Sequence, residues 1–214
     1  MSFTWQVTAL EDLARLIIDR AGSARPAIVA VNGHSSSGKT TLAGRLAVAL
    51  PAAAVLHTDD LAWHQGVFAW DELFLDAVLP VVRAGSPLDY RPPAWDARSR
   101  LGSITLPGGL AFLVVEGVGA SQTSVRAAFD LVLWVETDEP TRLGRDLPRL
   151  AAGEMSMPDY YSWMAEENAY VTRERPWEQA DLIVNGGDAI PHNPETDVIL
   201  ARQATSVTEP LSTS

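Results

Sequence analysis

The chain of 214 residues contains no cysteine, and only one of its 16 basic residues, Lys39, is a lysine. Without cysteine the chain cannot form a disulfide framework, a thiolate metal site or a thiol nucleophile. No stretch approaches the run of about eighteen apolar residues that a membrane-spanning helix needs, so we expect no membrane partner. What remains is a globular composition, with 47% hydrophobic and 20% charged residues.

Positive charge is also scarce, because 16 basic side chains face 27 acidic ones and the net charge is -11 at pH 7. A field of this sign repels nucleic acid and anionic membranes, so we expect neither as a partner, and any phosphate site must be local. The first residues lack the basic-then-apolar layout of a signal peptide. We therefore expect a cytoplasmic protein.

Short apolar runs rich in β-branched residues alternate along the chain with segments long enough to be helical crossovers. This alternation predicts an α/β fold around a mainly parallel sheet, with helices on both faces. The five expected strands are residues 27–31, 53–57, 111–115, 131–135 and 181–184.

The segment Gly33-His34-Ser35-Ser36-Ser37-Gly38-Lys39-Thr40 matches the pattern G-x-x-x-x-G-K-[ST] between an expected strand and an expected helix. The glycines let the backbone curl so that N–H groups point into one concavity, where Lys39 reaches phosphates and Thr40 can ligate magnesium. A serine-rich turn is the alternative, but the only lysine of the chain falls here. The pattern predicts a doubly wound P-loop NTPase fold that binds ATP and Mg²⁺. The expected ATP-binding residues are Gly33, Ser35, Ser36, Ser37, Gly38, Lys39, Thr40 and Thr41.

Two expected strands end in carboxylates, at the sheet edge where ligands bind in open α/β folds. Asp59 and Asp60 follow residues 53–57, and Asp59 can accept a proton from a substrate hydroxyl; an Asp-Asp turn or helix cap is the alternative. Glu116 follows residues 111–115 and can hold magnesium, with Thr40, or assist proton removal. A GTPase is disfavoured because Asn185-Gly186-Gly187-Asp188 lacks the lysine of a guanine-reading motif.

These motifs together resemble the uridine kinase and nicotinamide riboside kinase group of P-loop kinases. The resemblance rests on GHSSSGKTTLAGRLA, on Asp59-Asp60 and on the strand that ends in Glu116-Gly117, and it continues into the segment from Arg142 to Arg149. It implies that Asp59 lies beside the accepting hydroxyl and Glu116 near the metal. It also implies that Arg142 and Arg145 belong to a lid that closes over the transferring phosphate.

The lid is expected at about residues 138–157. Asp138 can cap a helix there, and Arg142, Arg145 and Arg149 follow near-helical spacing, which places three guanidinium groups on one face. Such a face can neutralise charge on a transferring phosphoryl group. A solvated arginine face that pairs with nearby acids is the alternative.

Residues 61–109 form an expected excursion over the substrate side of the sheet. Its aromatic residues can stack on a planar base, although core packing is the more common role of any one of them. Residues 95–100 resemble a shortened form of the stretch that lies near the nucleoside in the kinase group. The candidate substrate-binding residues are Asp59, Trp63, Tyr90, Trp95 and Arg100.

The sequence thus predicts a kinase domain over residues 1–190 and a polar, partly disordered tail over residues 191–214. The expected catalytic residues are Lys39, Asp59, Glu116, Arg142 and Arg145. The expected activity is transfer of the γ-phosphoryl group of ATP to a hydroxyl of a nucleoside or nucleoside-like acceptor. Two alternatives stay open: a kinase of another small alcohol, such as a sugar, vitamin precursor or antibiotic, and a regulatory protein that binds nucleotide without turnover.

Overall fold

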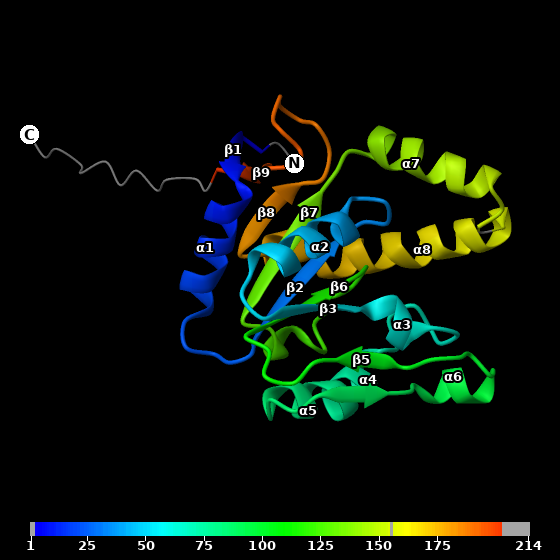
Figure 1. Ribbon diagram of the computed structural model, residues 1–214. Helices are drawn as coiled ribbons and strands as arrows, with labels where there is room; N and C mark the ends of the chain where they lie inside the picture. Colours follow the sequence, from blue (N-terminus) through cyan, green and yellow to red (C-terminus); the bar gives the residue numbers. More distant parts are fainter. Residues whose placement is uncertain (1–2, 155, 203–214) are drawn as a thin grey trace, which may run out of the picture.

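The computed structural model describes residues 3–154 and 156–202. Its main sheet has the strand order β1-β9-β8-β7-β2-β6-β3, and the five strands from β8 to β3 are mutually parallel (Figure 1). β9 runs antiparallel to β8, and β1 runs antiparallel to β9. The strands are β1 (Trp5–Ala9), β2 (Ala27–Gly33), β3 (Ala53–His57), β6 (Phe112–Glu116), β7 (Leu131–Glu136), β8 (Leu182–Asn185) and β9 (Asp197–Ala201).

Both faces of this sheet are covered. On one face α1 (Leu10–Ala21) and α2 (Lys39–Ala49) pack against Val29 and Val31 of β2. On the other face η1 (Phe74–Val78) and α5 (Leu79–Arg83) pack against Ile28 and Ala30 of the same strand. Because β2 is buried on both faces, its sequence reads as a continuous apolar run rather than an alternating one.

The expected excursion contains several short elements that cover the second face below β3 and β6 (Figure 1). These elements are α3 (Thr58–Ala62), α4 (Asp71–Leu73), η1, α5, β4 (Leu88–Tyr90), α6 (Pro93–Ala97) and β5 (Ile104–Leu106). β4 and β5 form a separate antiparallel pair. η2 (Arg126–Ala128) lies between β6 and β7, and η3 (Pro176–Glu178) precedes β8.

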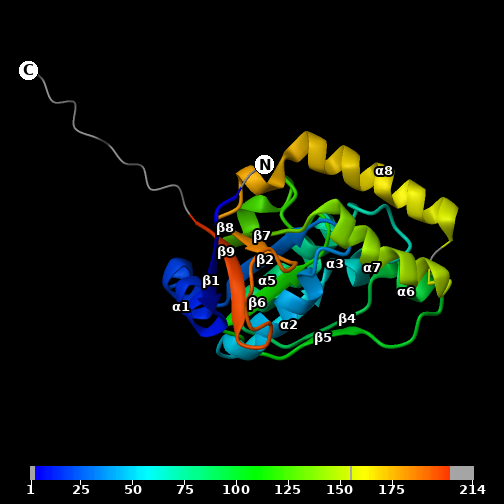
Figure 2. The same cartoon turned by 90° about the horizontal axis from the view of Figure 1, so that it is seen from above.

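Two helices extend beyond the end of the sheet where the parallel strands finish (Figures 1 and 2). Because the first of them lies within the expected lid segment, residues 138–157, the pair is called the lid helices. They are α7 (Glu139–Ala151) and α8 (Met157–Glu174). The expected cap is present, since the Asp138 side chain accepts a hydrogen bond from the Thr141 N–H at 2.8 Å. Pro148 lies inside α7 without ending it.

The five expected strands are all present, but the expected strand count was wrong because β1 and β9 extend the sheet to seven strands. The expected polar tail from residue 191 was also wrong over residues 197–201, which form β9. There Val198, Ile199 and Leu200 are buried, and this short apolar run supplies enough burial to pair with β8 and β1. Residues 203–214 lie outside the described residues. Within the described ranges, no helix combines the length and apolarity needed to span a membrane.

We expect the buried face of α2, and not its exposed face, to contribute to the free energy of unfolding. Leu46 is 0% exposed and Val48 is 88% exposed on the same helix. Leu46→Ala should lower the free energy of unfolding by about 2–5 kcal/mol, because it removes apolar contacts and leaves a cavity. Val48→Ala should change it by less than about 0.5 kcal/mol. Urea denaturation followed by circular dichroism measures both, and equal losses would contradict this packing.

Candidate active site

The turn between β2 and α2 approaches its neighbours so closely that glycine is required at two positions. A Cβ atom on Gly33 would lie 2.7 Å from the Val135 carbonyl oxygen and 2.8 Å from Ser37 Oγ. Gly38 has a φ of 97°, which side-chain-bearing residues rarely adopt. The backbone therefore curls tightly and leads directly into the first turn of α2, where unpaired N–H groups favour an anion.

Lys39 is the first residue of α2 and is buried beneath this turn. Its Nζ donates a hydrogen bond to the His34 carbonyl oxygen at 2.6 Å. Burial lowers the pKa of Lys39, while the negative charges of Glu116, Glu167 and Asp59 act in the opposite direction. The ammonium group is thus fixed in position inside the turn.

Glu116 ends β6 and is held by two neighbours. The register of the parallel sheet pairs it with His57 of β3, and His57 Nδ1 lies 2.5 Å from Glu116 Oε1. This hydrogen bond raises the pKa of His57. Thr40 Oγ1 donates to the same carboxylate oxygen at 3.2 Å.

The Thr40 hydroxyl and the Glu116 carboxylate together fit Mg²⁺, which prefers oxygen ligands and takes most of its others from phosphates and water. In the described part of the chain, no group of three or more His, Cys, Asp or Glu residues could hold a metal ion. The two expected metal-binding residues, Thr40 and Glu116, lie side by side. Because they supply only two ligands, they suit a metal ion that enters bound to a nucleotide.

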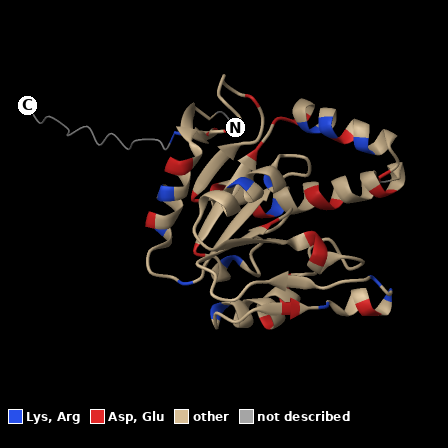
Figure 3. Cartoon of the chain, viewed as in Figure 1, with Lys and Arg blue, Asp and Glu red and all other residues tan. Residues whose placement is uncertain are grey.

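A cavity of about 490 Å³ lies between α2, α7 and the segment that joins β8 to β9. Residues 38–41 of the turn line its floor, together with Asn185, Gly186 and Asp188. Arg45, Arg145 and Arg149 also line it, and Figure 3 shows basic segments on α2 and on α7. A local positive site thus exists on a chain with a net charge of -11.

A second cavity, of about 180 Å³, lies on the other side of the turn and is lined by Ser35, Asp59, Asp146, Tyr160 and Trp163, among others. Asp59 belongs to α3 and lines this cavity, and part of its side chain is exposed. The surrounding protein partly desolvates its carboxylate, and this desolvation, followed by the charge of Glu116, raises the pKa of Asp59. Arg149 lines both cavities.

The lid helix α7 contacts the turn through its arginines. Arg145 donates to the carbonyl oxygens of Ser36 at 2.9 Å and Gly186 at 2.7 Å. Arg142 NH1 lies 3.7 Å from Glu167 Oε1, and its buried Nε has no hydrogen-bond partner among the described residues. Arg149 forms an ion pair with Glu154 at 2.9 Å, which corresponds to the alternative of a solvated arginine.

The other expected substrate-binding residues lie deeper in the excursion. Trp95 is 4% exposed and its Nε1 donates to the Asp60 carbonyl oxygen at 2.9 Å. Arg100 pairs with Asp60 at 2.7 Å, and its guanidinium lies 3.6 Å from the centre of the Trp95 ring. Trp63 and Tyr90 pack against the hydrophobic cluster of the second sheet face, to which Trp95 also belongs. None of Trp63, Tyr90, Trp95 and Arg100, all within the described residues, lines either cavity.

Several residues at the site were not predicted from the sequence. Glu167 of α8 is 0% exposed and contacts the turn, and Asp146 of α7 accepts a hydrogen bond from the Ser36 hydroxyl. His34 and His57, which show no metal-ligand spacing in sequence, each contact a buried carboxylate. His57 meets Glu116 because the register of β3 against β6 pairs them, and that register cannot be read from either strand alone.

No protein-family model matches the sequence, and no curated protein matches it significantly. Solved structures do match. One is a possible uridine kinase from Bacillus stearothermophilus, with 20% identity and a TM-score of 0.54 over 81% of this chain and 96% of that one. Another is a protein of Silicibacter sp. proposed to be a fructose transport system kinase, with 20% identity and a TM-score of 0.54 over 81% and 95%. The predicted α/β fold with a mainly parallel sheet is thus confirmed, and the chain shares its fold with these two proteins.

Gly186 offers a direct test of the larger cavity. A Cβ atom there would lie 1.8 Å from the Ser37 carbonyl oxygen and 2.6 Å from Thr137 Oγ1, whereas at Gly44 of α2, which lines neither cavity, no atom of the described residues would lie within 4 Å. Gly186→Ala should displace the turn between β2 and α2 and weaken Mg-ATP binding about tenfold or more. Gly44→Ala should bind like the wild type. Titration calorimetry measures both affinities, and an undisturbed Gly186→Ala would show that this wall does not shape the nucleotide site.

Proposed function

We propose that the chain is a Mg-ATP-dependent kinase that phosphorylates a hydroxyl group of a small uncharged acceptor, with a nucleoside or nucleoside-like compound as the first candidate. The observation that carries this proposal is the meeting of two cavities at one turn. The cavity of about 490 Å³ has the size and charge for a nucleotide, and the cavity of about 180 Å³ has room for a small acceptor. Lys39 lines the larger cavity and Asp59 the smaller one, and the charge of each residue shifts the pKa of the other.

The larger cavity supports ATP as the phosphoryl donor. Its floor is the curled turn and the first turn of α2, which direct N–H groups and the Lys39 ammonium toward phosphates. Mg-ATP bound there would supply the γ-phosphoryl group, with its metal held by Thr40 and Glu116. Asn185-Gly186-Gly187-Asp188 lines the wall without the lysine that reads guanine, which favours ATP over GTP.

The proposed reaction is a direct in-line transfer. The acceptor hydroxyl gives its proton to Asp59 as its oxygen forms a bond to the γ-phosphorus, and the bond from that phosphorus to the β–γ bridging oxygen breaks. Lys39 and Arg142 offset the negative charge that spreads over the transferring group. Arg142 lines neither cavity, but its buried Nε has no hydrogen-bond partner among the described residues, and a donor of this kind suits such a charge.

The smaller cavity supports an uncharged acceptor. Asp59, Asp146 and Glu154 line it, and the charge of its one arginine, Arg149, is paired with Glu154. An anionic acceptor would therefore meet repulsion. The names of the two structural neighbours refer to uridine and to fructose, which are both uncharged hydroxyl compounds.

A second candidate keeps the reaction and changes the acceptor to a small alcohol without a base, such as a sugar. This candidate is favoured because Trp63, Tyr90 and Trp95, which the sequence offered as stacking platforms for a base, pack in or against the hydrophobic cluster of the excursion instead of lining the cavity. Tyr160 and Trp163 are the aromatic residues that do line it.

The proposal is tested by incubating the protein with Mg-ATP and paired acceptors that differ only in charge, such as nucleosides and nucleoside monophosphates, or sugars and sugar acids. Mass spectrometry should detect phosphate gain on uncharged members alone. Lys39→Ala should cut turnover about a hundredfold or more, because the ammonium stabilises transition-state charge. Arg15→Ala, which removes one exposed charge on α1, is the control. Tight ATP binding with no acceptor modified would instead assign the chain as a regulatory protein.

Replacement of Asp59 should raise the stability of the protein and lower its turnover. Its raised pKa means that the folded state disfavours the ionised form, so its contribution to stability is lost as the pH rises through that pKa. Asp59→Asn should therefore raise the melting temperature at about pH 7, and this gain should shrink as the pH falls toward about 4. The same variant should lose about 10²-fold or more in turnover, because the proton acceptor is gone. A variant that is both fully active and no more stable would refute the assignment.

A further inference from the structure

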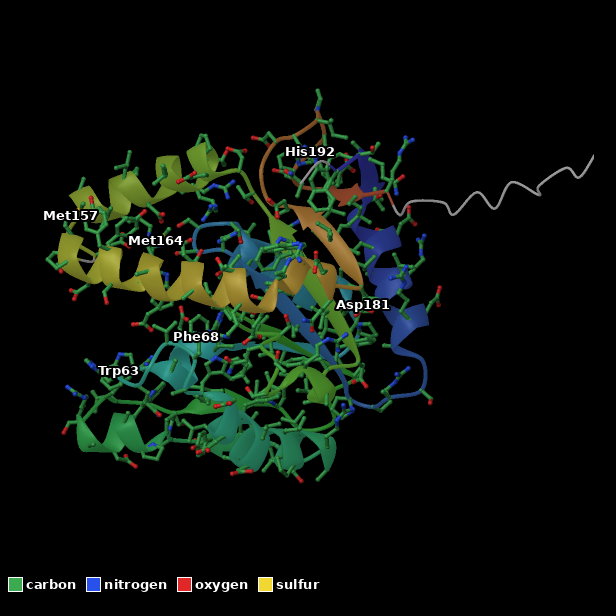
Figure 4. The ribbon with its side chains drawn as sticks, turned by 180° about the vertical axis from the view of Figure 1, so that it is seen from behind. Trp63, Phe68, Met157, Met164, Asp181 and His192 are labelled. Atoms are coloured by element: carbon green, nitrogen blue, oxygen red, sulfur yellow. The ribbon has the colours of Figure 1, made fainter. Side chains whose placement is uncertain are left out.

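One face of α8 lies along the phosphate-binding turn. Trp163, Glu167 and Tyr170 are spaced by four and three residues, so they share this face. Trp163 lines the smaller cavity, Glu167 contacts the turn, and the Tyr170 hydroxyl lies 2.8 Å from Asn32 Nδ2 in the buried interior. Figure 4 shows Phe68 below this helix, and its ring stacks on Tyr170 with centroids 4.7 Å apart. The helix is therefore anchored firmly beside the turn.

Glu167 makes the closest contacts between this helix and the turn. Its carboxylate lies 2.6 Å from His34 Nδ1 and accepts a hydrogen bond from the Ser35 N–H at 3.0 Å. It also accepts from Trp163 Nε1 at 3.3 Å and lies 3.7 Å from Arg142 NH1. Both oxygens of the carboxylate are thus occupied by groups on the turn and on the two lid helices.

A carboxylate that is 0% exposed requires partners, because burial by itself disfavours its charge. Burial acts to raise the pKa of Glu167, but the hydrogen bonds from His34 and Ser35 outweigh it, and the pKa is lowered. A charged Glu167 is therefore the stable form, and it binds its donors more strongly than a neutral group would.

The contact continues from Glu167 to the reactive centre. His34 and Ser35 are the two residues that Glu167 holds, and the carbonyl oxygen of His34 is the group that accepts from Lys39 Nζ at 2.6 Å. Glu167 thus contacts the peptide that orients the ammonium, although it lines neither cavity.

We infer that Glu167 is a positioning residue: it fixes the His34–Ser35 peptide of the turn and, through the His34 carbonyl, the direction of the Lys39 ammonium. Because Glu167 belongs to α8 and shares its face with Trp163, the acceptor cavity and the phosphate-binding turn are held by one rigid element. Only the effect of this contact on turnover rests on the proposed function; the effect on the turn itself does not.

Hydrogen–deuterium exchange of the protein without nucleotide tests the inference. In Glu167→Ala the peptide that covers residues 33–38 should exchange about tenfold faster or more, because the Ser35 N–H loses its acceptor and the turn opens more often. Lys39 is the only lysine, so acylation by an amine reagent, read by peptide mass, reports on it alone, and Lys39 should react faster. Glu167→Gln should show a smaller increase in exchange, since its amide oxygen can still accept from Ser35.

Glu174→Ala is the matched control. Glu174 lies on the same helix, and its carboxylate accepts from the Thr123 N–H at 2.8 Å, away from the turn. Its removal should speed exchange at Thr123 and leave residues 33–38 unchanged. With an acceptor in hand, kcat should fall about tenfold or more in Glu167→Ala and stay unchanged in Glu174→Ala. A merely structural role would lower the melting temperature without separating the two variants in kcat.

Unchanged exchange at residues 33–38 and unchanged Lys39 acylation in Glu167→Ala would overturn the inference. If Glu167→Ala does not fold, Glu167→Gln carries the same measurement, and wild-type exchange in that variant would also overturn it. A wild-type chain that binds no Mg-ATP, while Glu167→Ala still loosens the turn, would refute the proposed function and leave the inference in place.

Discussion

The hydrogen bond from Lys39 Nζ to the His34 carbonyl oxygen is the interaction around which the site is built. It holds a buried cation at the start of α2, where the helix N-terminus alone would favour an anion. Burial lowers the pKa of Lys39, and three carboxylates from separate elements act to raise it: Glu116 from β6, Asp59 from α3 and Glu167 from α8. The sheet edge, the excursion and the lid helices must all be in place before that balance exists.

The same arrangement separates charge across the turn. Basic side chains of α2 and α7 outnumber the two aspartates, Asp188 and Asp197, that line the larger cavity, whereas acidic side chains outnumber the one arginine, Arg149, that lines the smaller cavity. On a chain with a net charge of -11, the basic side is an exception confined to one place. Under the proposed function, this difference in charge favours a highly charged donor in the larger cavity and an acceptor without negative charge in the smaller one.

What the sequence could predict was local. The turn from Gly33 to Thr40, the strands beside it and the Asp138 cap depend on neighbouring residues, and the structure contains them. Glu167 was beyond prediction because its partner Ser35 is 132 positions away and no spacing rule links them. Trp95 was misleading for a different reason: its ring packs in the core and its Nε1 reaches the Asp60 carbonyl, a role that composition cannot separate from ligand stacking.

Arg149 contributes to the walls of both cavities from a single position on α7. Its helix is tied to the turn by Arg145, which bonds to the backbone of Ser36 and Gly186. The shapes of the two cavities are therefore not independent. A displacement of α7 would thus change the shape of both cavities at once.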